Sequence, residues 1–326
     1  MNKRDLTIVV KGAHLQMDGL NRSPRLSQLL HRGQVRQHGE ANSATNLLFE
    51  LFGLSRQGDA DFPVAAVTRV LDLGVVDNNW WLRADPVHLA TGMGGLTLVA
   101  NRGLGLSANE AEQLAEEVRA QYRDEGWLLK APNPYRWYLK PKEPARIITH
   151  ALDEVLGKDI EQYLPAGPEE KKWHTLMNEI QILLHTSASN VDREQRGELT
   201  VNSLWLWGGG SLPQVNSSEW TKVWSDDVVS LALARISKTD AGKIPIDPSE
   251  WLQSLDAGRH LLVVDRQEQG VVEDYMEQVW SEPLSRALKG GDLDKLCIYI
   301  APDLSVSFTP SSVRSIWGWL RPFRRA

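Results

Sequence analysis

The sequence predicts an α/β protein in which helices cover a mostly parallel sheet, with an inserted α+β subdomain. Short apolar runs that are typical of buried strands lie near both ends of the chain, accompanied by helical patterns. These runs are residues 6–10, 260–265 and 296–303. A denser pattern of strand, helix, strand and strand occupies the middle of the chain. We therefore expect a discontinuous core of residues 1–78 and 199–326, interrupted by an inserted α+β and helical subdomain of residues 79–198.

Composition places the chain among ordinary globular proteins and excludes several other classes. Of its 326 residues, 42% are hydrophobic and 24% are charged. The net charge of −6 and the isoelectric point near 5.8 argue against a general nucleic-acid-binding protein, which needs a basic surface. The single cysteine, Cys297, cannot form a disulfide framework. No run reaches the about 18 apolar residues of a membrane span, and the first apolar run is too short for a signal peptide, so we expect a cytoplasmic protein.

The first part of the chain contains one strand and two helices. The strand of residues 6–10 ends at Lys11. The segment SPRLSQLLHRG, residues 23–33, has a serine at the N-cap position, a proline in the first turn and leucines along one face, which predicts a short helix. A second helix covers residues 44–52. The pattern VAAVTRVLDLG, residues 64–74, fits either a strand or a short helix.

The middle of the chain is typical of a compact α+β unit. A strand at residues 96–102 precedes a helix that begins after Ser107. Glu110 completes a capping box with this serine, and Gly126 ends the helix. The remaining elements expected here are strands at residues 127–131 and 135–140 and a helix at residues 169–187.

The segment LTVNSLWLWGGGSLP, residues 199–213, is a strand that runs into three glycines. Glycines after a strand let backbone N–H groups approach an anion closely, but a tight turn after a buried strand needs glycine as well, so both interpretations stay open. Residues 217–230 are either helical or loop-like. The strands at residues 260–265 and 296–303 then flank a helix at residues 271–288.

Several motifs, in their order along the chain, resemble the archaeal-type, metal-dependent, cofactor-independent phosphoglycerate mutases of the alkaline phosphatase superfamily. They are SPRLSQLLHRG, the stretch from Arg83 through LVANRG to YRWYLK, and NSLWLWGGGSLP. The motifs WLRADPVHL, NEIQILLH and NSLWLWGGG resemble more closely a bacterial branch of that superfamily, the RpfE-type regulatory proteins. The resemblance implies an alkaline-phosphatase-like sheet, and it links the chain by name to the control of virulence-factor production.

The resemblance also implies a metal site, and the sequence departs from it. Related mutases and phosphatases need two divalent metals held by aspartates and histidines. The first ligand position is Lys11 here, and a cation cannot ligate Mn²⁺ or Mg²⁺. The later positions keep Asp265 and Asp303 but lack the histidines, since no histidine follows His260. We therefore expect a degenerate site without metal, and Mn²⁺ or Mg²⁺ only if substituted ligands rebuild it.

Anion binding is the part of such a site that the sequence could retain. The resemblance places Arg83, Arg102 and Arg136 where related mutases use basic residues near the phosphorylated substrate. Asp85 and His88 could orient these arginines or bind the ligand directly. In the alternative, Arg83 pairs with Asp85 or a neighbouring helix, the other two arginines are solvated surface charges, and His88 is structural.

A second group of residues is expected in the wall of the old active site, where the chain returns from the inserted subdomain to the main sheet. The group consists of Asn202, Trp205, Trp207, Gly208 and Gly209. Lys11 could hold a phosphate at the same edge of the sheet, or it could form an ion pair with Asp265 or Asp303.

These residues predict a catalytically degenerate, phosphoglycerate-mutase-like protein with a regulatory or ligand-sensing role, whose ligand is a small phosphorylated or carboxylate molecule. Two alternatives stay open: an active metal-dependent mutase or phosphatase with rearranged ligands, and a scaffold that binds only protein. We expect no nucleic-acid partner. The tail of residues 312–326 interleaves tryptophan with arginine, but Gly318 and Pro322 interrupt it, so it is a poor membrane anchor.

Overall fold

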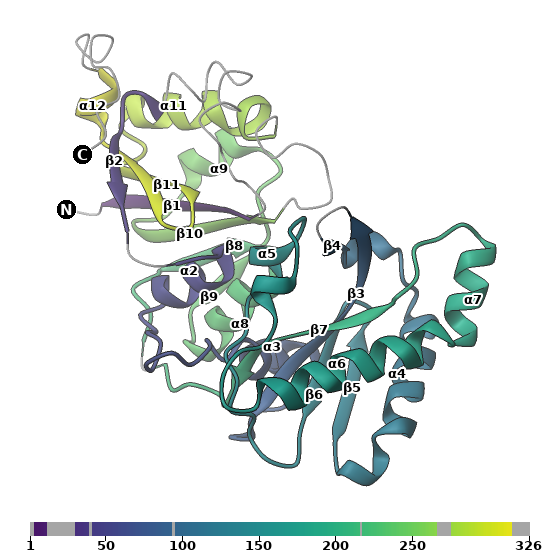
Figure 1. The fold of residues 1–326 in the computed structure, drawn as a ribbon. Helices are drawn as coiled ribbons and strands as arrows, with labels where there is room; N and C mark the ends of the chain where they lie inside the picture. The colour runs from purple at the N-terminus through teal and green to yellow at the C-terminus, as the bar shows by residue number, and fades with distance from the viewer. Residues whose placement is uncertain are drawn as a thin grey trace. The chain divides into compact units, whose positions relative to one another are not determined.

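Two β-sheets organise the chain (Figure 1). A computed structural model describes residues 3–11, 30–38, 41–92, 95–215, 217–265 and 275–314. Contacts between Cα atoms divide the chain into two units, Met1–Gly53 with Val215–Ala326 as the first and Leu54–Gln214 as the second. Each unit is built around one of the sheets.

The first unit contains a seven-stranded sheet. Its strands are β1 (Arg4–Lys11), β2 (Gln34–Gln37), β8 (Lys222–Ser225), β9 (Asp240–Gly242), β10 (Gly258–Asp265), β11 (Lys295–Ala301) and β12 (Leu304–Phe308). Their order across the sheet is β2-β12-β11-β1-β10-β8-β9. Parallel pairing joins β11, β1, β10, β8 and β9, whereas β12 runs antiparallel to both of its neighbours. This mostly parallel sheet confirms the α/β class that the sequence predicts.

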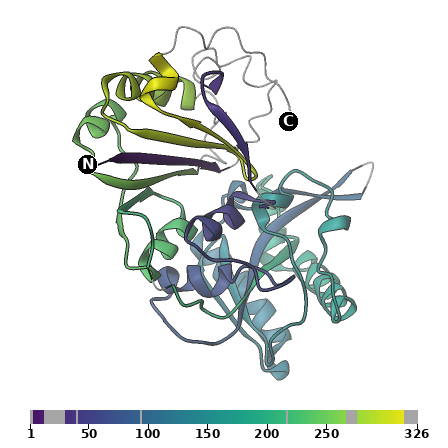
Figure 2. The same ribbon diagram turned by 90° about the vertical axis from the view of Figure 1, so that its left-hand side faces the viewer.

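Helices cover both faces of the seven-stranded sheet. They are α2 (Ala44–Leu51), α8 (Val228–Ile236), α9 (Pro248–Ser254), the π-helix η5 (Met276–Trp280), α11 (Ser281–Gly290) and α12 (Pro310–Arg314). Alternate residues of β1, Leu6, Ile8 and Val10, point into an apolar cluster that includes Trp251 of α9 and Trp280 of η5. Figures 1 and 2 show α9 and α11 on one side of the strands and α2 and α8 on the other. The strands are therefore buried on both faces, which accounts for their near-continuous apolar sequence.

The second unit contains a five-stranded antiparallel sheet. Its strands are β3 (Trp81–Gly92), β4 (Gly95–Ala100), β5 (Leu128–Asn133), β6 (Arg136–Lys140) and β7 (Ser203–Gly210). The order is β4-β3-β6-β5, and β7 also pairs with β3. The long strand β3 pairs with β6 and β7 near its start and with β4 near its end, so it is the common support of this sheet.

Helices and short turns surround the five-stranded sheet. They are α3 (Val64–Asp72), α4 (Ala108–Gln121), α5 (Leu152–Val155), α6 (Glu170–His185), α7 (Ala188–Gln195) and the 3₁₀ turns η2 (Arg102–Leu104), η3 (Arg123–Glu125) and η4 (Glu161–Tyr163). Both α3 and α6 contact β7, and α4 contacts β5. The pattern of residues 64–74, which fitted a strand or a helix, is therefore the helix α3.

Local capping signals place several helix ends as expected. The Ser107 hydroxyl accepts a hydrogen bond from the Glu110 N–H at 3.2 Å, and the Glu110 carboxylate accepts one from the Ser107 N–H at 3.0 Å. After α4, the turn η3 ends at Gly126, whose φ of +72° favours glycine. The predicted helix at residues 23–33 lies mostly outside the described residues, which resume at Leu30.

Three expectations differ from the structure. Residues 217–230 form neither one helix nor a loop, because β8 is followed by the start of α8. The strand β7 does not return to the main sheet but pairs with β3, and it continues through Gly210. Residues 54–78 and 199–214, expected in the core, belong to the second unit because α3 packs on β7 and β3.

None of the helices in the described ranges is both long and apolar enough to cross a membrane.

Candidate functional site

The carboxyl ends of the parallel strands bring charged residues to one edge of the seven-stranded sheet. Lys11 ends β1 and Asp265 ends β10, and these two residues are partners in the register of the two neighbouring strands. Asp303 follows the end of β11, and Asp227 follows β8 by two residues. Because parallel strands end at the same edge, this edge is where α/β sheets usually present a ligand site.

Lys11 and Asp227 form a buried ion pair at this edge. The Lys11 Nζ atom lies 2.9 Å from Asp227 Oδ2, and the two side chains are 6% and 1% exposed. The other carboxylate oxygen, Oδ1, accepts a hydrogen bond from the Ser230 N–H at 2.9 Å, so Asp227 is also the N-cap of α8. Both carboxylate oxygens are therefore used by the fold.

The expected ion pair at Lys11 is present, and it includes a partner that the sequence reasoning did not name. The ammonium contacts Asp227, in addition to whatever Asp265 and Asp303, the expected partners, contribute. The backbone carbonyl of Asp303 accepts a hydrogen bond from the His38 N–H at 2.6 Å. The sequence does contain a signal that could have identified Asp227. It directly precedes the apolar helical run VVSLALARI, which is a typical N-cap position.

Among the residues described at this edge, the pair of Lys11 and Asp227 does not fit a two-metal centre. Such a centre needs carboxylates and imidazoles that face the ions with their charge uncompensated. Here the Lys11 ammonium already compensates Asp227 and would repel a divalent cation at hydrogen-bond distance. Within the described part of the chain, no three or more histidine, cysteine or carboxylate side chains are grouped so that they could hold a metal ion.

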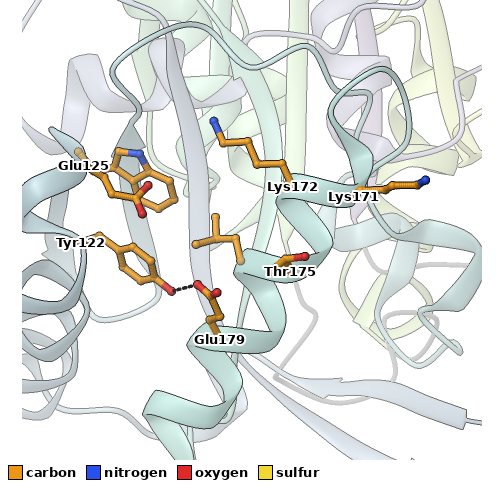
Figure 3. A pocket seen from close by; sticks show the side chains of 8 residues that line it. Tyr122, Glu125, Lys171, Lys172, Thr175 and Glu179 are labelled. Atoms are coloured by element: carbon orange, nitrogen blue, oxygen red, sulfur yellow. Dashed lines mark hydrogen bonds between the residues drawn. The ribbon is translucent and has the colours of Figure 1, made fainter.

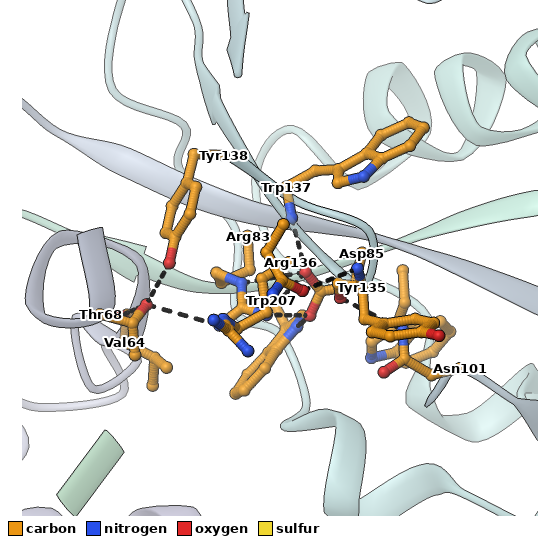
Figure 4. Close-up of polar contacts among 12 residues, drawn as sticks. Val64, Thr68, Arg83, Asp85, Asn101, Tyr135, Arg136, Trp137, Tyr138 and Trp207 are labelled. Carbon is orange, nitrogen blue, oxygen red and sulfur yellow. Dashed lines mark hydrogen bonds and ion pairs between the residues drawn. The ribbon is translucent and has the colours of Figure 1, made fainter. Parts of the chain in front are cut away.

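Arg83 and Asp85 form a second buried ion pair, in the five-stranded sheet (Figure 4). The Arg83 Nη2 atom lies 2.8 and 2.7 Å from the two Asp85 oxygens, and Nε lies 3.0 Å from Oδ1. The Trp207 indole N–H and the Trp137 backbone N–H also donate to Asp85, at 2.8 and 3.1 Å. Complete burial raises the pKa of Asp85, and Arg83 and Trp207 oppose that rise. The predicted pairing of Arg83 with Asp85 is thus confirmed, and β3 carries both residues.

Arg136 makes a bidentate pair with Asp72 at the end of α3. Its Nε and Nη2 atoms each lie 2.7 Å from an Asp72 oxygen, and the Tyr138 hydroxyl donates to Asp72 at 2.5 Å. Burial acts to raise the pKa of Asp72, but the hydrogen bonds from Arg136 and Tyr138 outweigh it and lower the pKa below its ordinary value. Arg136 is therefore held in place by Asp72. It is not the solvated surface charge that the alternative interpretation of the sequence expected.

His88 and Asn202 connect β3 to the segment before β7. The His88 Nδ1 atom donates to the Thr200 carbonyl at 2.8 Å, because a carbonyl oxygen only accepts. The Asn202 side chain accepts from the Leu89 N–H at 2.7 Å and donates to the Leu89 carbonyl at 2.8 Å. Both side chains serve the strand pairing in this structure. Arg102 lies half-buried at the start of η2.

Gly208, near the end of β7, uses its backbone N–H group inside the protein. The Gly208 N–H donates to Thr149 Oγ1 at 3.0 Å, and the Thr149 hydroxyl in turn donates to the Asp61 carboxylate. Asp61 also accepts a hydrogen bond from the Thr149 N–H at 2.9 Å. Burial raises the pKa of Asp61, against the effect of these hydrogen bonds. A carboxylate of the chain itself, Asp61, is thus connected to this glycine segment through Thr149, which the sequence reasoning missed.

Close packing explains why glycine is needed here. Gly208 has a φ of +64°, and a Cβ atom on it would lie 2.7 Å from the Val64 Cβ atom. A Cβ atom on Gly209 would lie 2.5 Å from the Trp80 ring. Trp205 is 1% exposed and its indole N–H donates to the His150 carbonyl at 2.9 Å, so it is a core residue of the second unit.

Comparison with known proteins finds phosphoglycerate mutases among the relatives. No protein-family model matches the chain. The 2,3-bisphosphoglycerate-independent phosphoglycerate mutase of Methanosarcina barkeri is 32% identical over 111 residues, 33% of this chain and 28% of that protein. The probable 2,3-bisphosphoglycerate-independent phosphoglycerate mutase of Geobacter sulfurreducens is 25% identical over 156 residues, 48% of this chain and 39% of that protein.

Two solved structures resemble the chain along most of its length. The PH0037 protein from Pyrococcus horikoshii matches with a TM-score of 0.51 and 12% identity over 95% of this chain and 88% of that one. The cofactor-independent phosphoglycerate mutase from Thermoplasma acidophilum matches with a TM-score of 0.43 and 17% identity over 94% of this chain and 90% of that one. In sequence, the chain spans between 28% and 39% of the length of the two curated relatives described above. It is similar to cofactor-independent phosphoglycerate mutases over that part, and it shares the fold of the PH0037 protein.

Proposed function

We propose that this chain is a catalytically degenerate relative of the phosphoglycerate mutases that acts as a regulatory or ligand-sensing protein. One observation carries the proposal: the buried Lys11 ammonium, 2.9 Å from Asp227, at the carboxyl edge of the parallel sheet. Metal-dependent phosphoryl transfer needs divalent ions to compensate the charge of the phosphoryl oxygens. A fixed lysine at this edge supplies one positive charge that is already paired. The resemblance to RpfE-type regulatory proteins belongs to this proposal.

The ligand of such a protein would be a small phosphorylated or carboxylate molecule. Arg83 is enclosed, with 4% of its side chain exposed, and it is fully engaged by Asp85. Arg136 is 21% exposed and its partner Asp72 is 10% exposed, so a ligand anion could reach this guanidinium. Arg102 is half-buried at the start of η2. We therefore assign the anion contact to Arg136 and Arg102 rather than to Arg83.

The second candidate is a working metal-dependent mutase or phosphatase with rearranged ligands. The names of the two curated relatives favour it, because both are phosphoglycerate mutases. In that case Asp227, Asp265 and Asp303 would be the carboxylates nearest to a metal.

Metal analysis and an activity assay separate the two candidates. We expect the purified chain to contain less than stoichiometric Mn, Zn and Mg by mass spectrometry, and to show no phosphoglycerate interconversion when Mn²⁺ is added. Stoichiometric metal together with turnover that is lost in Asp265→Asn and Asp303→Asn would refute the degenerate site.

A thermal-shift titration with phosphoglycerate tests ligand sensing. We expect the ligand to raise the Tm of the wild type and to have a smaller effect on Arg136→Gln. Arg146→Gln is the matched control, because the Arg146 side chain is 74% exposed and lies 3.9 Å from its acidic partner. The sensing hypothesis fails if phosphoglycerate shifts no Tm, or if it shifts the Tm of Arg136→Gln as much as that of the wild type.

A further inference from the structure

A cavity of about 350 Å³ lies in the second unit beside the first half of α6 (Figure 3). Its wall is formed by residues from the end of α4, the turn η3, the residue before β5 and α6. None of these residues takes part in the sheet edge or in the arginine pairs described above. The volume is within the range of cavities that accept small organic ligands.

The floor of the cavity is apolar and rigid. Tyr122 and Leu176 are 4% and 6% exposed. The Trp127 indole stacks on the Tyr122 ring, with centroids 5.0 Å apart, and on the Trp173 ring at 5.8 Å. Because these rings already hold each other in place, a ligand that contacts them need not order them, which lowers the cost of binding.

Carboxylates lie along one wall. The Tyr122 hydroxyl donates to Glu179 Oε2 at 3.2 Å, and Glu125 lines the same cavity (Figure 3). Burial and the negative charges of Glu179 and Glu125 raise the pKa of Tyr122, so this phenol stays protonated and remains a donor. An ammonium group in the cavity would therefore meet two carboxylates.

Ammonium groups lie on the other wall. Lys171 and Lys172 belong to the first turn of α6. Figure 3 shows that Lys172 extends from α6 in the direction of Glu125, whereas Lys171 extends the opposite way. Among the residues that the structure describes, none of these two lysines and two glutamates takes part in an ion pair. A carboxylate in the cavity would therefore meet at least one uncompensated ammonium, that of Lys172.

We propose that this cavity binds a small zwitterion, a molecule with an ammonium and a carboxylate on an apolar body, such as a free amino acid with a large apolar side chain. Its ammonium would contact Glu179 and Glu125, its carboxylate would contact Lys172, and its side chain would pack on the floor. A ligand with only negative charge would be repelled by the glutamates, and one with only positive charge by the lysines. The proposal is independent of phosphoglycerate binding, which concerns other residues.

Calorimetric titration with L-phenylalanine and L-leucine tests the proposal. We expect saturable binding of at least one of them, with a Kd on the order of 1 mM or tighter. N-acetylphenylalanine lacks the ammonium and phenylalanine amide lacks the carboxylate. Each should bind at least about 10-fold more weakly than phenylalanine, because one charge-assisted hydrogen bond is lost.

Matched variants test the assigned contacts. Lys172→Met and Glu179→Gln should each weaken binding by about 10-fold, and because both residues are exposed the variants should keep the wild-type circular dichroism spectrum. Lys142→Met and Glu143→Gln, exposed residues outside the cavity, should bind as the wild type does. The proposal is overturned if neither amino acid binds saturably, if the two derivatives bind as well as phenylalanine, or if both cavity variants bind as the wild type does.

Discussion

Replacing Lys11 with methionine should destabilise the first unit strongly, because it would leave the Asp227 carboxylate buried without its ammonium partner. The two side chains are 6% and 1% exposed and the charged atoms lie 2.9 Å apart. Removing one partner of a buried ion pair costs about 3–5 kcal/mol, whereas an exposed pair contributes about 0–1 kcal/mol. Methionine is unbranched and can fill the space of the lysine stem, so most of the loss should come from the missing charge.

The assay is urea unfolding followed by circular dichroism, on Lys11→Met, Asp227→Asn and the double variant. Asparagine keeps the N-cap hydrogen bond of α8, so Asp227→Asn removes mainly the charge. The double variant should lose less stability than the sum of the two single variants, by about 0.5–3 kcal/mol. Lys142→Met, an exposed replacement of the same kind, should change stability by less than about 0.5 kcal/mol. A cost of Lys11→Met below about 1 kcal/mol, or additive effects, would refute the reasoning from a buried pair.

Three further predictions concern the charged pairs of the two units. Lys11→Asp exchanges the internal cation for a carboxylate next to Asp227, so Mn²⁺ should raise the Tm of this variant and leave that of the wild type unchanged; equal shifts in both would contradict the internal-cation interpretation. Asp85→Ala should lower the free energy of unfolding by about 3–5 kcal/mol in a urea titration, because Arg83 would remain buried without its carboxylate, and a cost near zero would contradict that role. The folded-state pKa of Asp72 is lowered, so its contribution to stability is present above its ordinary value of 3.8 and is lost as the pH falls through the folded pKa. As the pH falls, the Tm of Asp72→Asn should therefore decrease less than the Tm of the wild type. Identical plots of Tm against pH for the two proteins would exclude this contribution.

Each unit contains a buried ion pair that neutralises a basic group. Lys11 and Arg83 were expected to face a phosphorylated ligand, and each is neutralised by an aspartate of the chain, as Arg136 is by Asp72. The proposed function relies on Arg136 and Arg102 for contact with a ligand because the Arg136 side chain is 21% exposed, whereas those of Arg83 and Lys11 are 4% and 6% exposed.

The sequence by itself determined the elements whose signals are local. The alternating apolar residues of β1, the capping box at Ser107 and Glu110, and the end of β10 at Asp265 each depend on residues a few positions apart. The position of Lys11 at the end of a buried strand also follows from the sequence. The pairing of Arg83 with Asp85 was one of the alternatives that the sequence left open, and it is possible because residues two apart on a strand share a face.

Only the tertiary structure decided which distant groups meet. Asp227 is 216 positions from Lys11, and Asp72 is 64 positions from Arg136, so no local pattern connects them. The strand β7 was predicted from its composition, but its placement beside β3 depends on the packing of α3 and on the hydrogen bond from Trp207 to Asp85. A short apolar strand fits either sheet by periodicity alone. Which strand β7 pairs with depends on the burial of its side chains and on the hydrogen bonds of its polar groups. Both exist only once the chain is folded.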